Sequence, residues 1–402
     1  MLEESEEMNK NIYTTKFLNL FIKILIVEEQ YGENYIKKIV DNEEFNYLLK
    51  KIELENLYKF IRKNKLYFLI SKSIFMKKNM PCFFIEEILN FTRIAKKLCF
   101  ENVVLTCEIY KLLKKENIEV IFFKGPILSL QTTGSIFSRG PSVDIDILIK
   151  RHNLIKTINT LLKNGFKIRK ASQIYLRNDF YGWYSRNVNT QMILFKDFSD
   201  HILHIDLHWN LSFLKNKIPD ESILFNNKDY VNFNNIFIPT LNKKHALIHS
   251  SVHNAVDDWK KLIGIIDFER LIKNFNILEI KELKKDKLFL NNCLRCCQIT
   301  NSPKINDILR NYYPKIKILN TKYNKFFINY EIYNNKNWNI INRFFKLIKH
   351  IILTNSPIEI TKIILNHLLP PKDFWNEKYN RINFFHEICI LRIKKIYKLL
   401  RN

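Results

Sequence analysis

Residues 140–152 read GPSVDIDILIKRH, and this stretch decides how the whole chain is interpreted. Asp144 and Asp146 stand two positions apart in an apolar run that continues to Ile149, and such a run predicts a buried β-strand. Because strand side chains alternate, the two carboxylates face one side of the sheet, about 7 Å apart at their Cα atoms. Buried carboxylates repel each other unless a cation or a proton lies between them, and Mg²⁺ or Mn²⁺ prefers oxygen ligands. The pair therefore predicts a divalent metal site.

A third carboxylate is expected on a later strand. Residues 189–196 and 201–210 are strand-like stretches joined by only four residues, so they predict an antiparallel hairpin. Asp206 lies in the second stretch. If that strand lies beside residues 144–149 with its face matched, Asp206 completes a three-carboxylate cluster that can hold two metals for in-line displacement at phosphorus.

Each carboxylate also has a simpler explanation. Short acidic pairs are common on protein surfaces, so Asp144 and Asp146 could mark a solvated strand edge. His204 and His208 share the face of Asp206, and these three side chains could form an ordinary hydrogen-bonded polar patch.

The glycines locate the turn-rich part of the chain. Five of the 7 glycines fall between residues 125 and 182, whereas the flanking segments show apolar residues at helical spacing. Within the middle segment, strands at 119–123, at 144–149 and in the hairpin alternate with a helix at 103–118 and with a stretch at 154–168, in which a helix ends at Gly165 and a strand follows. We therefore predict an α+β fold, in which a small mixed or antiparallel sheet core is flanked by helical domains. The expected boundaries are an N-terminal helical region at 1–100, the core at 101–242 and a C-terminal helical domain at 243–402.

The formal net charge of +25 has two explanations. It could indicate an anionic partner such as nucleic acid, a nucleotide or a membrane surface. It could equally reflect a compositional bias, because lysine is spread over the whole chain rather than gathered in one arm. No motif supports nucleic-acid binding in particular.

The sequence predicts a cytoplasmic protein. The N-terminus, MLEESEEMNK, has no signal-peptide character, and no apolar run is long enough to span a membrane. The 7 cysteines show no regular spacing, which fits free thiols in a reducing compartment. Cys293, Cys296 and Cys297 lack a second ligand pair at zinc spacing, and we interpret them as thiols buried in a helix.

Three motifs in order carry a family resemblance. IFFKGPILSLQTTGSIFSRGPSVDIDILI (121–149) is followed by HIDLHWNL (204–211) and by HALIHSSVHNAVDDWKKLIGIIDFERL (245–271). Over about residues 100–275 the chain resembles the uncharacterised bacterial nucleotidyltransferases of the polymerase-beta-like superfamily. In that family a Lys-Gly follows a strand, an Arg precedes D-I-D, and a downstream helix carries H-x-x-x-H, a Trp and an Asp. The helix here would carry His249, His253, Trp259 and Asp267.

The resemblance implies transfer of a nucleoside monophosphate from an NTP, with ATP as the expected donor, to an acceptor. Asp144 and Asp146 would hold two Mg²⁺ or Mn²⁺ ions that bridge the phosphates. Asp206 would hold the catalytic metal and align or deprotonate the acceptor hydroxyl. Lys124 and Arg139 would neutralise the triphosphate.

The resemblance also implies a nucleotide contact at the Lys-Gly turn and a pocket lined by histidines. Gly125 would let the backbone approach the phosphates. The superfamily usually has Gly-Ser where this chain has Gly-Pro, so that serine contact is missing. His208, His249 and His253 would line the nucleotide or acceptor pocket. For the last two, whose i,i+4 spacing puts them on one helix face, a zinc site and a core role remain alternatives.

The acceptor is open among a small molecule, a peptide or protein, and RNA. Two other functions stay possible on the sequence: a nucleotide- or RNA-binding pseudoenzyme with the same fold, and a D-x-D glycosyltransferase.

Overall fold

The computed structural model describes residues 2–312 apart from residues 143, 199–200, 213, 215–216, 258, 260, 284–285 and 301, together with residue 360. The described residues divide into two compact units. A helical unit contains residues 2–103, 125–142 and those described between 246 and 312, and a sheet unit contains residues 104–124, those described between 144 and 245, and residue 360. Most of the residues predicted to form the C-terminal helical domain lie outside the described part. The division into three domains therefore stays a prediction.

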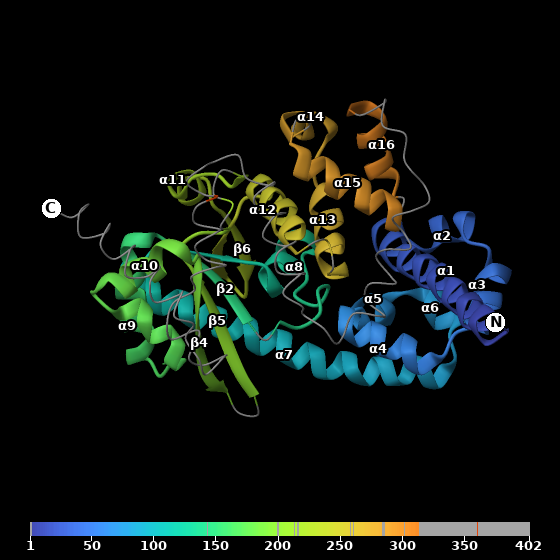
Figure 1. The fold of residues 1–402 in the computed structure, drawn as a ribbon, viewed down its shortest axis with the longest axis horizontal. Helices are drawn as coiled ribbons and strands as arrows, with labels where there is room; N and C mark the ends of the chain where they lie inside the picture. Colours follow the sequence, from blue (N-terminus) through green and yellow to red (C-terminus); the bar gives the residue numbers. More distant parts are fainter. Residues whose placement is uncertain are drawn as a thin grey trace. The chain divides into compact units, whose positions relative to one another are not determined.

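The sheet unit is built on one seven-stranded mixed sheet with the order β3-β4-β5-β2-β1-β7-β6. Its strands are β1 (Val120–Phe123), β2 (Asp144–Ile149), β3 (Lys167–Ile168), β4 (Gln191–Phe198), β5 (His201–His208), β6 (Asp229–Phe233) and β7 (Ile236–Thr240). The β2–β5 and β1–β7 pairs are parallel, and the remaining pairs are antiparallel. Figure 1 shows β2, β4 and β5 side by side. The predicted α+β class with a mixed sheet is confirmed.

Short helices connect the strands of the sheet unit. They are α9 (Leu154–Lys163), α10 (Phe180–Val188), α11 (Glu221–Asn226) and the 3₁₀ helices η1 (Arg151–Asn153) and η2 (Lys170–Leu176). The strand at 144–149 and the antiparallel β4–β5 hairpin were predicted and are confirmed. The β6–β7 hairpin was not predicted. Asn234 and Asn235 form its turn with φ of +47° and +63°, the left-handed pair that a tight two-residue hairpin requires.

The helical unit contains two series of helices. The first is α1 (Leu2–Tyr31), α2 (Glu33–Ile39), α3 (Asn42–Leu49), α4 (Leu54–Asn64), α5 (Tyr67–Lys72), α6 (Ile74–Asn79) and the first part of α7 (Cys82–Lys115). The second is α8 (Gly125–Thr133), α12 (Lys243–Val256), α13 (Leu262–Lys273), α14 (Ile277–Ile280), η4 (Lys281–Leu283), α15 (Lys287–Ile299) and α16 (Pro303–Tyr312). Aromatic contacts join three helices of the first series. Phe45 of α3 packs against Phe17 of α1 at 5.4 Å and against Phe75 of α6 at 5.1 Å between ring centroids. Within the described residues, no helix combines the length and the apolar character needed to cross a membrane.

The expectation of one continuous helix over residues 245–271 is wrong. The helix ends at Val256, and a new one begins at Leu262. Trp259 lies between them with φ of +54°, and its N–H donates to the carbonyl of Asn254 at 2.7 Å. A bulky residue is rarely stable in this left-handed conformation, so a compensating contact is expected. The indole N–H of Trp259 makes it, by donating to Asn292 Oδ1 at 3.1 Å.

Asn292 is the polar centre of this helix junction. It is fully buried, its Oδ1 also accepts from Asn254 at 2.9 Å, and its amide donates to the carbonyls of Ser251 and Leu288. Every hydrogen-bonding position of the side chain is therefore used.

Replacing this side chain should destabilise the helical unit. Asn292→Leu leaves buried donors and acceptors without partners, and we expect the free energy of unfolding in urea to fall by about 3–5 kcal/mol. The matched control is Asn291→Leu on the exposed face of the same helix, with a change of about 0.5 kcal/mol or less. Equal effects of the two variants would contradict the role assigned to Asn292.

Candidate functional site

The register of β2 against β5 builds the candidate site. The two strands are parallel, and their pairing sets Asp144 opposite His204, Asp146 opposite Asp206 and Leu148 opposite His208. The other faces of both strands are apolar and buried: Ile145, Ile147, Ile205 and Leu207 are at most 4% exposed. A slip of one residue would turn that apolar set to the wrong face, so core packing fixes the register. The same register brings the acidic faces of the strands together.

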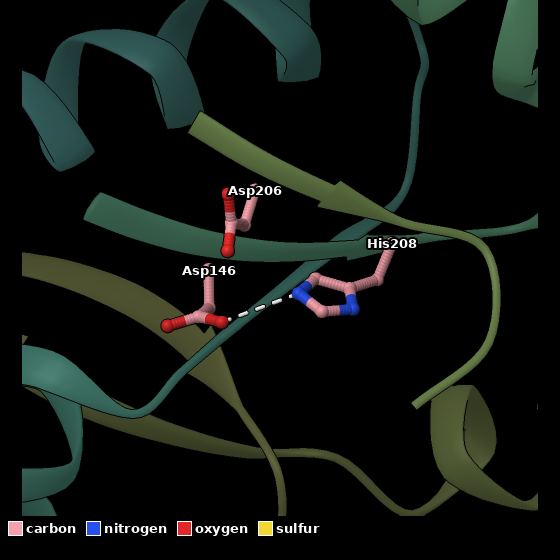
Figure 2. Close-up of side chains that lie close together, drawn as sticks. All are labelled: Asp146, Asp206 and His208. Carbon is pink, nitrogen blue, oxygen red and sulfur yellow. Dashed lines mark hydrogen bonds and ion pairs between the residues drawn. The ribbon is translucent and has the colours of Figure 1, made fainter. Parts of the chain in front are cut away.

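Two carboxylates and one imidazole converge on this face (Figure 2). One ligand atom from each of Asp146, Asp206 and His208 lies within 4.8 Å of the others. Asp146 and His208 are buried, and His208 Nε2 is 3.2 Å from Asp146 Oδ1. The His208 ring also packs edge-on against Phe123 of β1, at 5.1 Å between centroids. The imidazole is therefore held in place from two sides.

Lys124 brings a positive charge to the cluster. It follows β1, and its Nζ lies 2.8 Å from Asp146 Oδ1. Lys124 and Gly125 both have positive φ, +61° and +47°, so the chain turns sharply between β1 and α8. Glycine adopts the left-handed conformation readily because it has no Cβ atom, so Gly125 suits this turn. In Lys124 the same conformation is strained, because the Cβ atom lies close to the backbone.

The electrostatics of the two paired carboxylates differ. Burial raises the pKa of Asp206 to about 6, and repulsion from Asp146 and Asp144 adds to this rise. Burial would also raise the pKa of Asp146, but the Lys124 charge and the His208 hydrogen bond outweigh it and hold that pKa well below its usual range. Asp146 therefore stays ionised, while the repulsion between the like charges appears in the raised pKa of Asp206.

The pKa of His208 completes the description of the cluster. Burial lowers the pKa of the His208 imidazole, and the hydrogen bond with Asp146 opposes this effect only in part. The neutral imidazole that results is the form that can bind a metal ion.

The residues of the cluster fit a divalent cation. Two carboxylates suit Mg²⁺ or Mn²⁺, a neutral imidazole can add a nitrogen ligand, and a cation would relieve the repulsion that raises the pKa of Asp206. Among the described residues, this is the group in which the ligand atoms of three His, Cys, Asp or Glu side chains lie within 4.8 Å of one another. Asp144 faces the same side of the sheet but is not a member of the group. Its role as a metal ligand stays a prediction.

The other predicted site residues lie in the helical unit. Arg139 Nε donates to Asp267 Oδ2 at 2.7 Å, so this guanidinium is held by a carboxylate. His249 and His253 stack edge-on at 5.7 Å on α12, and His253 Nδ1 is 3.5 Å from Asp257. Within the described residues they are not part of a three-ligand group. The expected contacts of these residues and of Gly125 with a nucleotide stay predictions.

One neighbour of the cluster was missed by the sequence analysis. Gln191 of β4 lies opposite His208, and its Nε2 donates to Asp206 Oδ2 at 3.3 Å. Part of the signal was available: a hairpin with a four-residue turn at 197–200 pairs position 191 with 206, and the observed register, with Phe198 opposite His201, pairs it with 208. Both registers put Gln191 on the face of Asp206. Gln191 orients the Asp206 carboxylate.

Asp206→Asn should stabilise the free protein at high pH. A carboxyl whose pKa is raised in the folded state costs stability once it is ionised, above about pH 6, and costs none below its unfolded value near pH 4. In urea unfolding with EDTA we expect a gain of about 1–2 kcal/mol at pH 8, limited by solvent screening, which disappears by pH 4. Asp197→Asn, an exposed change on β4, is the control and should show no such gain. A variant less stable than the parent protein at pH 8 would refute the like-charge argument.

Comparison with known proteins assigns the chain to a family. A search of curated proteins finds no match. A family model described as "Uncharacterised nucleotidyltransferase" matches residues 50–298. This range covers well over half of the 402 residues and includes the Lys124–Gly125 turn, β2 and β5. The chain therefore belongs to this family of uncharacterised nucleotidyltransferases.

Proposed function

We propose that the protein transfers a nucleoside monophosphate from an NTP, with ATP as the expected donor, to the hydroxyl group of an acceptor. Family membership supports the class of reaction. The observation that carries the proposal is the in-register pair of Asp146 and Asp206, with His208 and Lys124 in contact with Asp146. Such a cluster offers hard ligands for a divalent cation and a positive charge for phosphate in one place.

The residues divide into metal ligands and phosphate contacts. Asp146, Asp206 and His208 would hold Mg²⁺ or Mn²⁺, with Asp144 contributing a further carboxylate from the same face of β2. The bound cation would neutralise charge on the phosphates and polarise the phosphorus–oxygen bond. Lys124 would contact the triphosphate, and Arg139 and Gly125 are proposed to do so as well.

Asp206 is the carboxylate best suited to face the acceptor. Asp146 is buried and carries both the Lys124 ion pair and the His208 hydrogen bond, whereas Asp206 is only partly buried and accepts from Gln191. In the proposed step the acceptor oxygen attacks the α-phosphorus and the bond to the pyrophosphate oxygen breaks. Asp206 would align the attacking hydroxyl and receive its proton.

Pyrophosphate release tests this function. Each of the four NTPs is incubated with Mg²⁺ or Mn²⁺, alone and with a small-metabolite, a peptide or an RNA fraction of the host. We expect release that Asp146→Asn or Asp206→Asn lowers by about 100-fold or more, because each removes a carboxylate that would hold the cation at the reacting phosphate. Asp197→Asn, on the exposed part of β4, should keep the activity.

The other outcomes identify the competing functions. Sugar release from a nucleotide sugar, without pyrophosphate release from any NTP, would replace the proposal with a glycosyltransferase. NTP binding without turnover in every fraction would favour a nucleotide-binding pseudoenzyme. Release that persists in both aspartate variants would show that another site performs the reaction.

A further inference from the structure

The Lys124 ammonium lies within the carboxylate cluster. Its Nζ is 2.8 Å from Asp146 Oδ1, the same oxygen that lies 3.2 Å from His208 Nε2. The Asp146 side chain is 4% exposed and that of Lys124 is 20% exposed, so little solvent screens this ion pair. Lys124 is thus bound at one of the atoms that a metal ion would use.

The charge of Lys124 acts on all three members of the cluster. It lowers the pKa of Asp146, opposes the rise in the pKa of Asp206, and contributes to the lowered pKa of His208. The ammonium is therefore the counter-charge of both carboxylates. A divalent cation at the same carboxylates would repel the ammonium strongly at such short range.

The backbone of Lys124 indicates that this placement is maintained against strain. A lysine with φ of +61° has a strained left-handed conformation, which glycine would adopt without that strain. Strained residues persist where the surrounding structure over-determines them, and they often mark functional positions. At this position the strained turn delivers a charge that glycine cannot supply.

We propose that Lys124 occupies the cation position of the free protein, and that a divalent cation binds only when the ammonium leaves Asp146. The triphosphate of an NTP carries more negative charge than one carboxylate, so it draws the ammonium away as it binds. Metal and NTP therefore bind cooperatively, and each raises the affinity for the other by the same factor. This inference rests on the metal role proposed above for Asp146, Asp206 and His208.

Mn²⁺ binding without NTP tests the inference, with free Mn²⁺ measured by electron paramagnetic resonance. Lys124→Met keeps most of the side-chain length but removes the charge, and we expect it to bind Mn²⁺ about 10-fold more tightly than the parent protein, within the usual range of coupling between sites. Lys124→Arg keeps the charge and should bind like the parent. Lys228→Met is the matched control, since Lys228 is 21% exposed and paired with Glu119 at 3.1 Å, and it should change nothing.

The outcomes separate this inference from the proposed function. Unchanged or weaker Mn²⁺ binding in Lys124→Met, with binding still lost in Asp146→Asn, would overturn the role of Lys124 and leave the metal site standing. Absence of Mn²⁺ binding from every variant, even with a non-hydrolysable NTP present, would overturn both.

A second measurement uses the unmodified protein, so it does not depend on the folding of a variant. Lysine side chains are labelled with an acetylating reagent and quantified by mass spectrometry, with Lys228 as the internal reference. Saturating Mn²⁺ should raise the labelling of Lys124 several-fold because the freed amine is more reactive, while Lys228 stays constant. If Lys124 labelling stays constant in protein with bound Mn²⁺, lysine and metal bind together and the displacement model is wrong.

Discussion

The parallel pairing of β2 with β5 is the contact on which the candidate site depends. It places Asp146 directly opposite Asp206, an arrangement that is destabilising for like charges on neighbouring strands. The rise in the pKa of Asp206 from 3.8 to about 6 puts the cost at no more than about 3 kcal/mol. On the opposite face, Ile145, Ile147, Ile205 and Leu207 are buried, and each contributes about 1.5–3 kcal/mol. The apolar face outweighs the repulsion and holds the carboxylates together.

The downstream residues that carry the family resemblance have structural partners in the helical unit. The indole of Trp259 is bound by Asn292, and Asp267 receives Arg139 at 2.7 Å. Asp267 also lies 3.8 Å from Arg270, which makes a two-point ion pair with Glu29 of α1. This chain of alternating charges fastens the segment before β2 to two helices. Trp259 and Asp267 of the 245–271 segment therefore stabilise the helical unit. A residue of the family pattern can have this structural role without contacting a substrate.

The sequence predicted the features that depend on local patterns and on strand alternation. The β2 strand, the β4–β5 hairpin and the shared face of Asp144 and Asp146 follow from residue alternation and turn length. The break at Trp259 could not be predicted, because it depends on Asn292, 33 residues away in the chain. The Lys124–Asp146 ion pair is also a tertiary result, since no local pattern gives the left-handed φ of a lysine. The sequence predicted Asp144 as the third ligand beside Asp146 and Asp206, whereas the close group in the structure contains His208, which the strand register brings next to that pair.

Several cations of the sheet unit are held by carboxylates, so they do not contribute to the net charge of +25, which comes from Lys and Arg in excess of Asp and Glu. In the sheet unit, Lys150 and Lys228 both pair with Glu119, Lys167 pairs with Asp197, and Arg177 pairs with Asp179. Lys124 is paired with Asp146 inside the cluster. A cation that already has a carboxylate partner attracts a polyanion weakly, because the ion pair must break before the new contact forms. A polyanion can still bind Lys124 if it carries more negative charge than the Asp146 carboxylate. A metal ion would then take the place of the lysine at Asp146. A triphosphate carries several negative charges, so a nucleotide bound here, as proposed above, would compete with the Asp146 carboxylate for Lys124.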